Sequence, residues 1–338
     1  LLGQNFEDFY VRISKDRNNW EIKIDDEKVS GIAEVPLSNK DPIILINLEK
    51  LQLKPFKGIA TDEQKIHNFS PLNLHVESFS YGNRHLGTLD LKTYSKDKTF
   101  FLKDLRLKGK EVEVGMNGKW ISEPAVTSSI VEAKGTTLEA LLSPLGYDIE
   151  IIESKTTTVL LDGTWNGTPR DFDLSKMDGT LKINIEDGRI LNLQPGTGRL
   201  FGLLSLQALP RRLSLDFKDL FRKGLSFDLI TGNFEISGGT ATTKNMLLEG
   251  PSVIIDLSGK TDLKNKGYDQ IAIVTPKLSE SIPIASALLG PVGIGAGAVY
   301  YLGQKVFKSL PEKVDDILRK KYRIQGTWTN PSVSKIER

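Results

Sequence analysis

The sequence predicts a mostly β protein, built from a long run of short antiparallel strands with few helices. Apolar and polar residues alternate in segment after segment, for example at 20–24 and again at 72–76. This is the period of a strand with one apolar face. Turn sequences such as Tyr81-Gly82-Asn83 separate the segments, as in antiparallel hairpins.

In chain order, a hairpin is predicted over 5–46, with 48–53 extending its last strand. Further strands are predicted at 72–76, 89–91, 105–107, 112–116, 156–190, 213–217, 227–236, 241–248, 253–257, 271–274 and 322–328. Gly-x-Trp recurs at 118–120, 163–165 and 326–328, each time within a predicted strand. Its spacing is irregular, so it indicates at most a degenerate strand-level repeat.

Two short helices interrupt the strands. Leucines at helical spacing follow a threonine cap at 136–145, which is the best internal boundary in the chain. A second helix is predicted over 198–212, where Pro210 ends the pattern.

Residues 281–304 carry no charge and are long enough to cross a hydrocarbon core, but Pro283, Pro291 and the four glycines between 290 and 297 make them a poor single helix. Two short helical pieces are expected, the second continuing as an amphipathic helix. The segment either lies in a membrane interface or packs as a buried hairpin, and its sequence fits both. If it meets a membrane, the contact residues are Ile284, Leu288, Leu289, Val292, Ile294, Val299, Leu302 and Val306.

Composition limits the function. The 338 residues have a net charge of +2 and no basic stripe alternating with aromatic residues, so nucleic acid is not an expected partner. The absence of cysteine excludes thiol catalysis, disulfides and cysteine-based zinc sites. The chain opens almost directly into strand-like sequence without a leader, so we interpret it as a piece of a longer protein.

No catalytic constellation is visible. His67, His75 and His85 match no metal-binding spacing, so neither a metal nor a cofactor is expected. The turn at 195–199 is glycine-rich but lacks the Gly-Lys-Ser/Thr of a phosphate-binding loop. The chain is therefore not expected to be an enzyme. The alternating strands fit either a closed sandwich or an open sheet whose apolar face forms a groove.

The longest specific run is GRLFGLLSLQALPRRLSLDF at 198–217, followed by GLSFDLITGNFEISGGTATTKNMLLEGPSVIIDLSGKTDL at 224–263. These segments, together with LEALLSPLGYDIEI at 138–151 and YRIQGTWTNPSV at 322–333, resemble the carboxy-terminal region of the YhdP family. That family comprises AsmA-like proteins of Gram-negative envelopes. The resemblance is good over 135–333 and looser before it.

The resemblance implies a long curved antiparallel sheet with an apolar groove, through which phospholipid moves between the inner and outer membrane. It implies a periplasmic protein, anchored in the inner membrane through an amino-terminal segment absent here, with its carboxy-terminal end toward the outer membrane. Phospholipids and both membranes are the implied partners, with other envelope proteins as a further possibility. The implied division is a groove segment at 1–134, a second groove segment at 135–280, a membrane-contact segment at 281–321, and a closing strand and tail at 322–338.

The strands that would line this groove carry nine apolar candidates. They are Ile183, Ile185, Phe234, Ile236, Val253, Ile255, Leu257, Ile271 and Ile273. The alternative hypothesis is a closed β-sandwich that serves as a structural or interaction module of the envelope, without a lipid conduit.

Overall fold

A computed structural model describes residues 10–38, 42–54, 70–142, 152–191, 225–277 and 319–336. Its 18 strands belong to one open sheet, and every strand pair with a defined register is antiparallel except one. This confirms the predicted mostly β fold with a long antiparallel sheet and few helices. The described residues contain no second sheet against which a sandwich could form.

By contacts between Cα atoms the chain divides into two compact units, one formed by 1–185 with 234–239 and the other by 186–233 with 240–338. The functional division predicted at residues 134, 280 and 321 stays a prediction. The first unit contains β1 Tyr10–Lys15, β2 Asn19–Asp25, β3 Val29–Pro36, β4 Ile44–Leu53, β5 Leu72–Tyr81, β6 Arg84–Lys96, β7 Thr99–Lys108, β8 Val112–Ser122, β9 Ala125–Gly135, β10 Ile152–Glu153 and β11 Thr156–Asn166. The strands β12 Asp178–Ile190 and β13 Leu225–Ser237 contribute residues to both units. The second unit contains β14 Thr240–Glu249, β15 Val253–Asp262, β16 Gly267–Pro276, β17 Lys320–Thr327 and β18 Pro331–Ile336.

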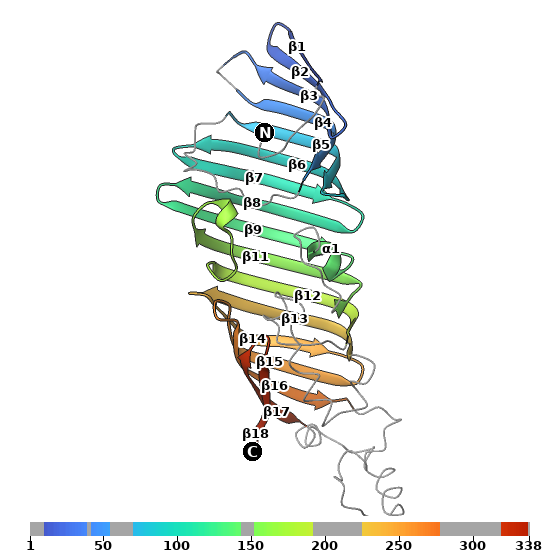
Figure 1. The fold of residues 1–338 in the computed structure, drawn as a ribbon, viewed down its shortest axis with the longest axis vertical. Helices are drawn as coiled ribbons and strands as arrows, with labels where there is room; N and C mark the ends of the chain where they lie inside the picture. The colour runs from blue at the N-terminus through green and yellow to red at the C-terminus, as the bar shows by residue number, and fades with distance from the viewer. Residues whose placement is uncertain are drawn as a thin grey trace, which may run out of the picture. The chain divides into compact units, whose positions relative to one another are not determined.

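In the first unit, strands that are neighbours in the sequence are neighbours in the sheet from β1 to β9, and β11 then pairs with β9 (Figure 1). The exception in direction is β4, which pairs with β5 in parallel. In the second unit, β14 to β18 pair in order and are all antiparallel.

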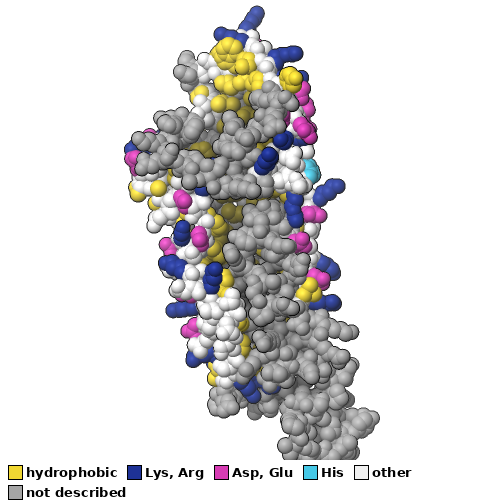
Figure 2. All heavy atoms as spheres, in the orientation of Figure 1, with side chains coloured by type: hydrophobic (Ala, Val, Ile, Leu, Met, Phe, Trp, Pro, Cys, Tyr) yellow, Lys and Arg dark blue, Asp and Glu magenta, His cyan; other side chains and the backbone are white. Residues whose placement is uncertain are grey.

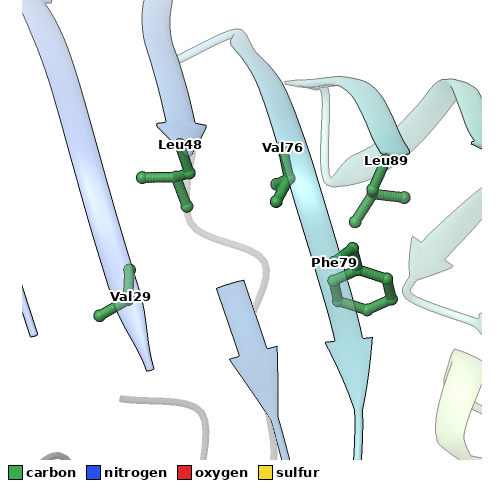
Figure 3. Packing of buried hydrophobic residues seen from close by; sticks show 5 residues of the cluster. All are labelled: Val29, Leu48, Val76, Phe79 and Leu89. Atoms are coloured by element: carbon green, nitrogen blue, oxygen red, sulfur yellow. The ribbon is translucent and has the colours of Figure 1, made fainter. Parts of the chain in front are cut away.

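The alternating sequence gives each sheet face its own chemistry. Near the start of the first unit, Val29, Leu48, Val76, Phe79 and Leu89 point to the same side of the sheet and form a buried cluster (Figure 3). They come from four successive strands, so the core of this unit is a layer along one face.

The helix predicted over 136–145 is present as α1 Leu138–Leu142. The Thr137 hydroxyl accepts a hydrogen bond from Ala140 N at 3.0 Å, which is the expected threonine cap. A single-turn 3-10 helix, η2 Pro169–Asp171, follows β11. The helix predicted over 198–212 and the segment 281–304 lie outside the described residues, as do all eight membrane-contact candidates. None of the helices described here has the length and apolar character needed to span a membrane.

Candidate functional site

Two continuous rows of apolar side chains cross the first unit, perpendicular to its strands. In a paired sheet, directly opposite residues lie on the same face, so the strand register identifies each row. We call them lane 1 and lane 2. Lane 1 consists of Val11, Ile24, Gly31, Leu48, Val76, Leu89, Leu107, Val114, Ala133 and Val159. Lane 2 consists of Ile13, Ile22, Ala33, Ile46, Leu74, Leu91, Leu105, Met116, Val131 and Leu161.

The two lanes lie side by side on one face. On each strand, the lane 1 residue and the lane 2 residue are two positions apart in the chain, which separates them by about 6.6 Å. From one strand to the next, each lane advances by about 4.8 Å. Apart from Gly31, every position in both lanes has an aliphatic or thioether side chain. The result is an apolar strip from β1 to β11 without a polar interruption.

The row between the lanes, on the opposite face, has a different character. It includes Asn47, His75, Asp90, Arg106 and Glu132 in register. His75 Nδ1 and Asp90 Oδ1 lie 2.8 Å apart, with both side chains about half exposed. This row is therefore largely polar and exposed to water, in contrast to the two lanes, although it also contains Ile32 and Leu160.

Burial varies along the lanes. Leu48, Val76 and Leu89 are buried, whereas Val11 and Ile13 on β1 are 43% and 61% exposed. Figure 2 shows apolar side chains open to this view around the first strands, with charged side chains along both margins.

The helix α1 lies on lane 1. Ala140 and Leu141 are buried in a cluster that includes the lane 1 residues Leu107, Val114, Ala133 and Val159. No lane 2 residue belongs to this cluster. At these strands α1 therefore covers lane 1, and lane 2 runs beside it.

Two hydrogen bonds hold α1 in place. Besides the Thr137 cap, Leu138 N donates to the buried Ser154 hydroxyl at 3.0 Å. Ser154 Oγ in turn lies 3.3 Å from Thr157 Oγ1. A Cβ atom on Gly135 would come within 2.7 Å of Leu141 Cγ, so the absence of a side chain at this position makes room for the leucine.

The second unit repeats the arrangement over fewer strands. Lane 3 consists of Leu248, Ile255, Val274 and Lys320. Lane 4 consists of Met246, Leu257, Ala272, Tyr322 and Lys335. All members from β14, β15 and β16 are at most 2% exposed.

The structure divides the nine candidate residues between two faces. Val253, Ile255 and Leu257 share the buried face of β15. Ile271 and Ile273 lie on the opposite face, because they pair with Ser258 and Asp256. On β16 the residues that join Ile255 and Leu257 are instead Val274 and Ala272.

The remaining four candidates lie on the two strands shared by the units. Ile185, Phe234 and Ile236 are almost fully buried, and Ile183 is half-buried on the same side of β12 as Ile185. These four therefore occupy inward positions of their strands.

Sequence reasoning named no residue of lanes 1 and 2 as a site residue. The signal that could have found them was the alternation at 72–76, 89–91 and 105–116, which was used only to place strands. What the sequence lacks is the register that joins these segments into rows.

One polar pair lies on the buried face beside lane 4. Gln270 and Thr261 are at most 1% exposed, and Gln270 Nε2 donates to Thr261 Oγ1 at 2.8 Å. Tyr268, the register partner of Thr261, has its pKa raised by burial, so its phenol stays neutral. Among the described residues, no three His, Asp or Glu side chains gather where a metal ion could bind.

An open antiparallel sheet with apolar rows on one face and hydrated rows on the other defines a class of protein that can shelter an elongated apolar ligand. Comparison with known proteins identifies the family. The model of the YhdP protein family matches residues 1–333, so the chain belongs to the YhdP family.

A curated relative is the intermembrane phospholipid transporter YhdP of Escherichia coli (strain K12). It is 29% identical over 226 residues, which cover 66% of this chain and 17% of the relative. The chain thus matches less than a fifth of that protein's length. The comparison with solved structures gave no match.

Proposed function

We propose that this chain is a section of a bridge-like lipid conduit, in which phospholipid acyl chains move along the apolar lanes. The observation that carries the proposal is the continuity of lanes 1 and 2 from β1 to β11. The activity named for the E. coli relative, intermembrane phospholipid transport, supports the choice of cargo.

A continuous apolar lining matters because an acyl chain must stay shielded from water at every step of its movement. Removing one methylene from water is worth about 0.8 kcal/mol, so an acyl chain that reached a polar gap would lose several kcal/mol of this stabilisation at once. A lining of similar aliphatic side chains keeps this energy nearly level as the tail moves from strand to strand. Transfer then requires no catalytic residue.

Two neighbouring lanes suit a lipid with two acyl chains, because each chain can contact one row. The headgroup can remain in water beyond the edge of the apolar strip. Where α1 covers lane 1, we infer that a tail is displaced toward lane 2, so this helix narrows the path.

The location that fits this activity is the periplasm, with an inner-membrane anchor outside this chain and the carboxy-terminal end toward the outer membrane. The name of the relative, which describes transport between membranes, supports this placement. We further propose that residues 281–304 contact a membrane, because this stretch is uncharged and rich in apolar residues.

The test uses two substitutions on β9. Val131 lies in lane 2, opposite Met116 and Leu161, whereas its neighbour Ile130 lies on the opposite face and is 42% exposed. We expect Val131→Asp to abolish transfer of fluorescent phospholipid between donor and acceptor vesicles, because a charge interrupts the apolar row. Ile130→Asp introduces the same charge into the same strand and should leave transfer within twofold of the unchanged chain.

Native mass spectrometry of each variant would report co-purified phospholipid, and circular dichroism would show that both remain folded. Loss of bound lipid in Val131→Asp alone is the expected result. If both folded variants carry lipid and transfer it at the normal rate, the lanes are not the conduit. Ile183→Asp, at a half-buried candidate on β12, provides a second site for the same comparison.

A further inference from the structure

A row that contains two tryptophans borders the apolar strip of the first unit on the side of lane 2. In register, this tryptophan row consists of Ser95, Phe100, Trp120, Thr127 and Trp165. Trp120 lies four positions after the lane 2 residue Met116 in β8, so both side chains are on the lane face. The strip is thus bordered by rings that combine an apolar surface with one N–H donor.

The two tryptophans of this row differ in their hydrogen bonds. Trp165 is 5% exposed, and its Nε1 donates to the Thr168 carbonyl oxygen at 2.9 Å. Trp120 is half-buried, and its Nε1 is shielded from water without an acceptor among the described residues. A buried donor without an acceptor costs free energy, so the Trp120 N–H requires an explanation. Trp328 of the second unit also lacks an acceptor, but the apolar side chains of lanes 3 and 4 are buried.

Lane 2 is accessible beside Trp120. Its residues Met116 and Val131 are half-buried, in contrast to the apolar side chains of lanes 3 and 4. Between lane 2 and the tryptophan row lie Gly118 and its register partner Ser129. Because Gly118 has no side chain, this part of β8 leaves room between Met116 and Trp120.

Two features favour this margin of the strip as the place for a lipid headgroup. The helix α1 covers lane 1 from β7 to β11, and no lane 2 residue belongs to its cluster, so the edge beside lane 2 stays uncovered by α1. At β11 this edge is filled, because the fully buried Met177 lies where a side chain on Gly163 would be. The margin at β8, next to Trp120, is therefore the place where a headgroup can leave the strip.

We propose that the Trp120 indole N–H donates a hydrogen bond to an ester carbonyl of a phospholipid whose acyl chain lies in lane 2. The ester carbonyl joins the acyl chain to the glycerol, so it is an acceptor that an apolar ligand carries to a position that water does not reach. Tryptophan rings at the border of an apolar region also occupy the headgroup level in membrane proteins. The proposal rests on the proposed function, since it assumes that lane 2 holds an acyl chain.

This contact gives the conduit a means of selecting its cargo. Along lanes 1 and 2 the contacts are apolar and interchangeable, so they do not distinguish one lipid from another. A donor at the margin favours lipids whose chains are linked through esters, because an ether linkage has no carbonyl oxygen. Trp165 cannot take this role, since its N–H is already bound to Thr168.

The experiment measures lipid binding to the 338-residue chain by isothermal titration calorimetry. The two probes are a short-chain diester phosphatidylglycerol below its micellar concentration and the diether with the same chains and headgroup. The test variant, Trp120→Phe, keeps an aromatic ring and removes the donor. Trp165→Phe makes the same change in the same row and is the matched control.

We expect the unchanged chain to bind the diester about fivefold more tightly than the diether, as one hydrogen bond predicts. Trp120→Phe should lose this preference through weaker binding of the diester, with affinity for the diether within about twofold of the unchanged chain. Trp165→Phe should keep the preference. Circular dichroism should show a lower midpoint of thermal unfolding for Trp165→Phe, which loses a hydrogen bond, and not for Trp120→Phe.

Equal binding of the two lipids by the unchanged chain would overturn the proposal without any variant. It would also fail if Trp120→Phe kept the preference, or if this variant lost the same affinity for both lipids, which would indicate a packing effect. Loss of the preference in Trp165→Phe would show that the donor is not specific to Trp120. In each of these cases lipid binding leaves the conduit standing, whereas binding of neither lipid by the unchanged chain would reject both proposals.

Discussion

At the scale of single residues, glycines decide how closely neighbouring strands approach. Gly118 on β8 and Gly163 on β11 belong to the recurring Gly-x-Trp pattern, and the register places them on either side of Ser129. Their tryptophans, Trp120 and Trp165, likewise flank Thr127. The repeat noticed in the sequence therefore corresponds to two aligned rows across β8, β9 and β11.

We expect Gly118→Ala to destabilise the chain by roughly 1–3 kcal/mol. A Cβ atom at this position would lie 2.4 Å from the Ser128 carbonyl oxygen, a backbone atom that cannot move without disturbing the ladder. Gly115→Ala in the same strand is the control, because no atom lies within 4 Å of its Cβ position. Urea unfolding of the two variants measures the difference, and equal stabilities would contradict the close-packing argument.

Residue chemistry also explains which candidates the sequence could assign to a face. On β15, Asp256 and Lys260 leave one face clearly apolar, so Val253, Ile255 and Leu257 could be grouped correctly. On β16, residues 271–274 are apolar on both faces, and alternation cannot choose between them. The residues of β16 that point inward include Gln270. Its amide can be buried because it donates a hydrogen bond to the Thr261 hydroxyl.

At the scale of elements, α1 is the piece of regular structure that modifies the apolar face. Its five residues are too few to form a stable helix alone, so its stability comes from the Thr137 cap and from packing on lane 1. An element held in this way can be released by a small change. It is therefore a suitable place to ask whether covering a lane limits lipid occupancy.

We expect Leu141→Asn to loosen α1, because it places a polar side chain among Val112, Val114 and Ala133. Hydrogen exchange at residues 138–142 should become faster, and native mass spectrometry should find more phospholipid bound as lane 1 opens. Glu139→Gln, a change outside the buried residues of α1, is the control. If exchange rises in Leu141→Asn and bound lipid does not, α1 does not restrict the path.

At the scale of the whole molecule, the sequence predicted strands in most of the segments where the structure has them, but it missed β9, β10 and β18, and it did not predict the rows that the strands form. Alternation is a local property, read within one strand. A lane depends on register, which turn lengths and bulges set from one strand to the next. For example, β4 and β5 pair in parallel, so hairpin rules alone would have placed Leu48 and Val76 in the wrong relation.

The strand order also predicts how far the effect of a destabilising substitution extends along the chain. Within each unit most contacts join strands that are neighbours in the sequence, as in repeat proteins, where stability is approximately a sum over adjacent repeats. Ile255 in lane 3 is 1% exposed, so Ile255→Asp should lower the free energy of unfolding by several kcal/mol. Its neighbour Ile254 is half-buried on the opposite face, and Ile254→Asp is the matched control.

Hydrogen exchange followed by mass spectrometry would locate the effect. We expect Ile255→Asp to remove protection from β14 to β18 while β2 to β9 exchange as in the unchanged chain, because the loss is confined to the unit that contains the substitution. Ile254→Asp should cause a much smaller change in the same strands. If Ile255→Asp raises exchange equally in β2 to β9, the chain unfolds as one cooperative body, and the nearest-neighbour description is wrong. If protection falls only in β14 to β18, lipid binding to lanes 1 and 2 can be measured in the same variant without interference from the second unit.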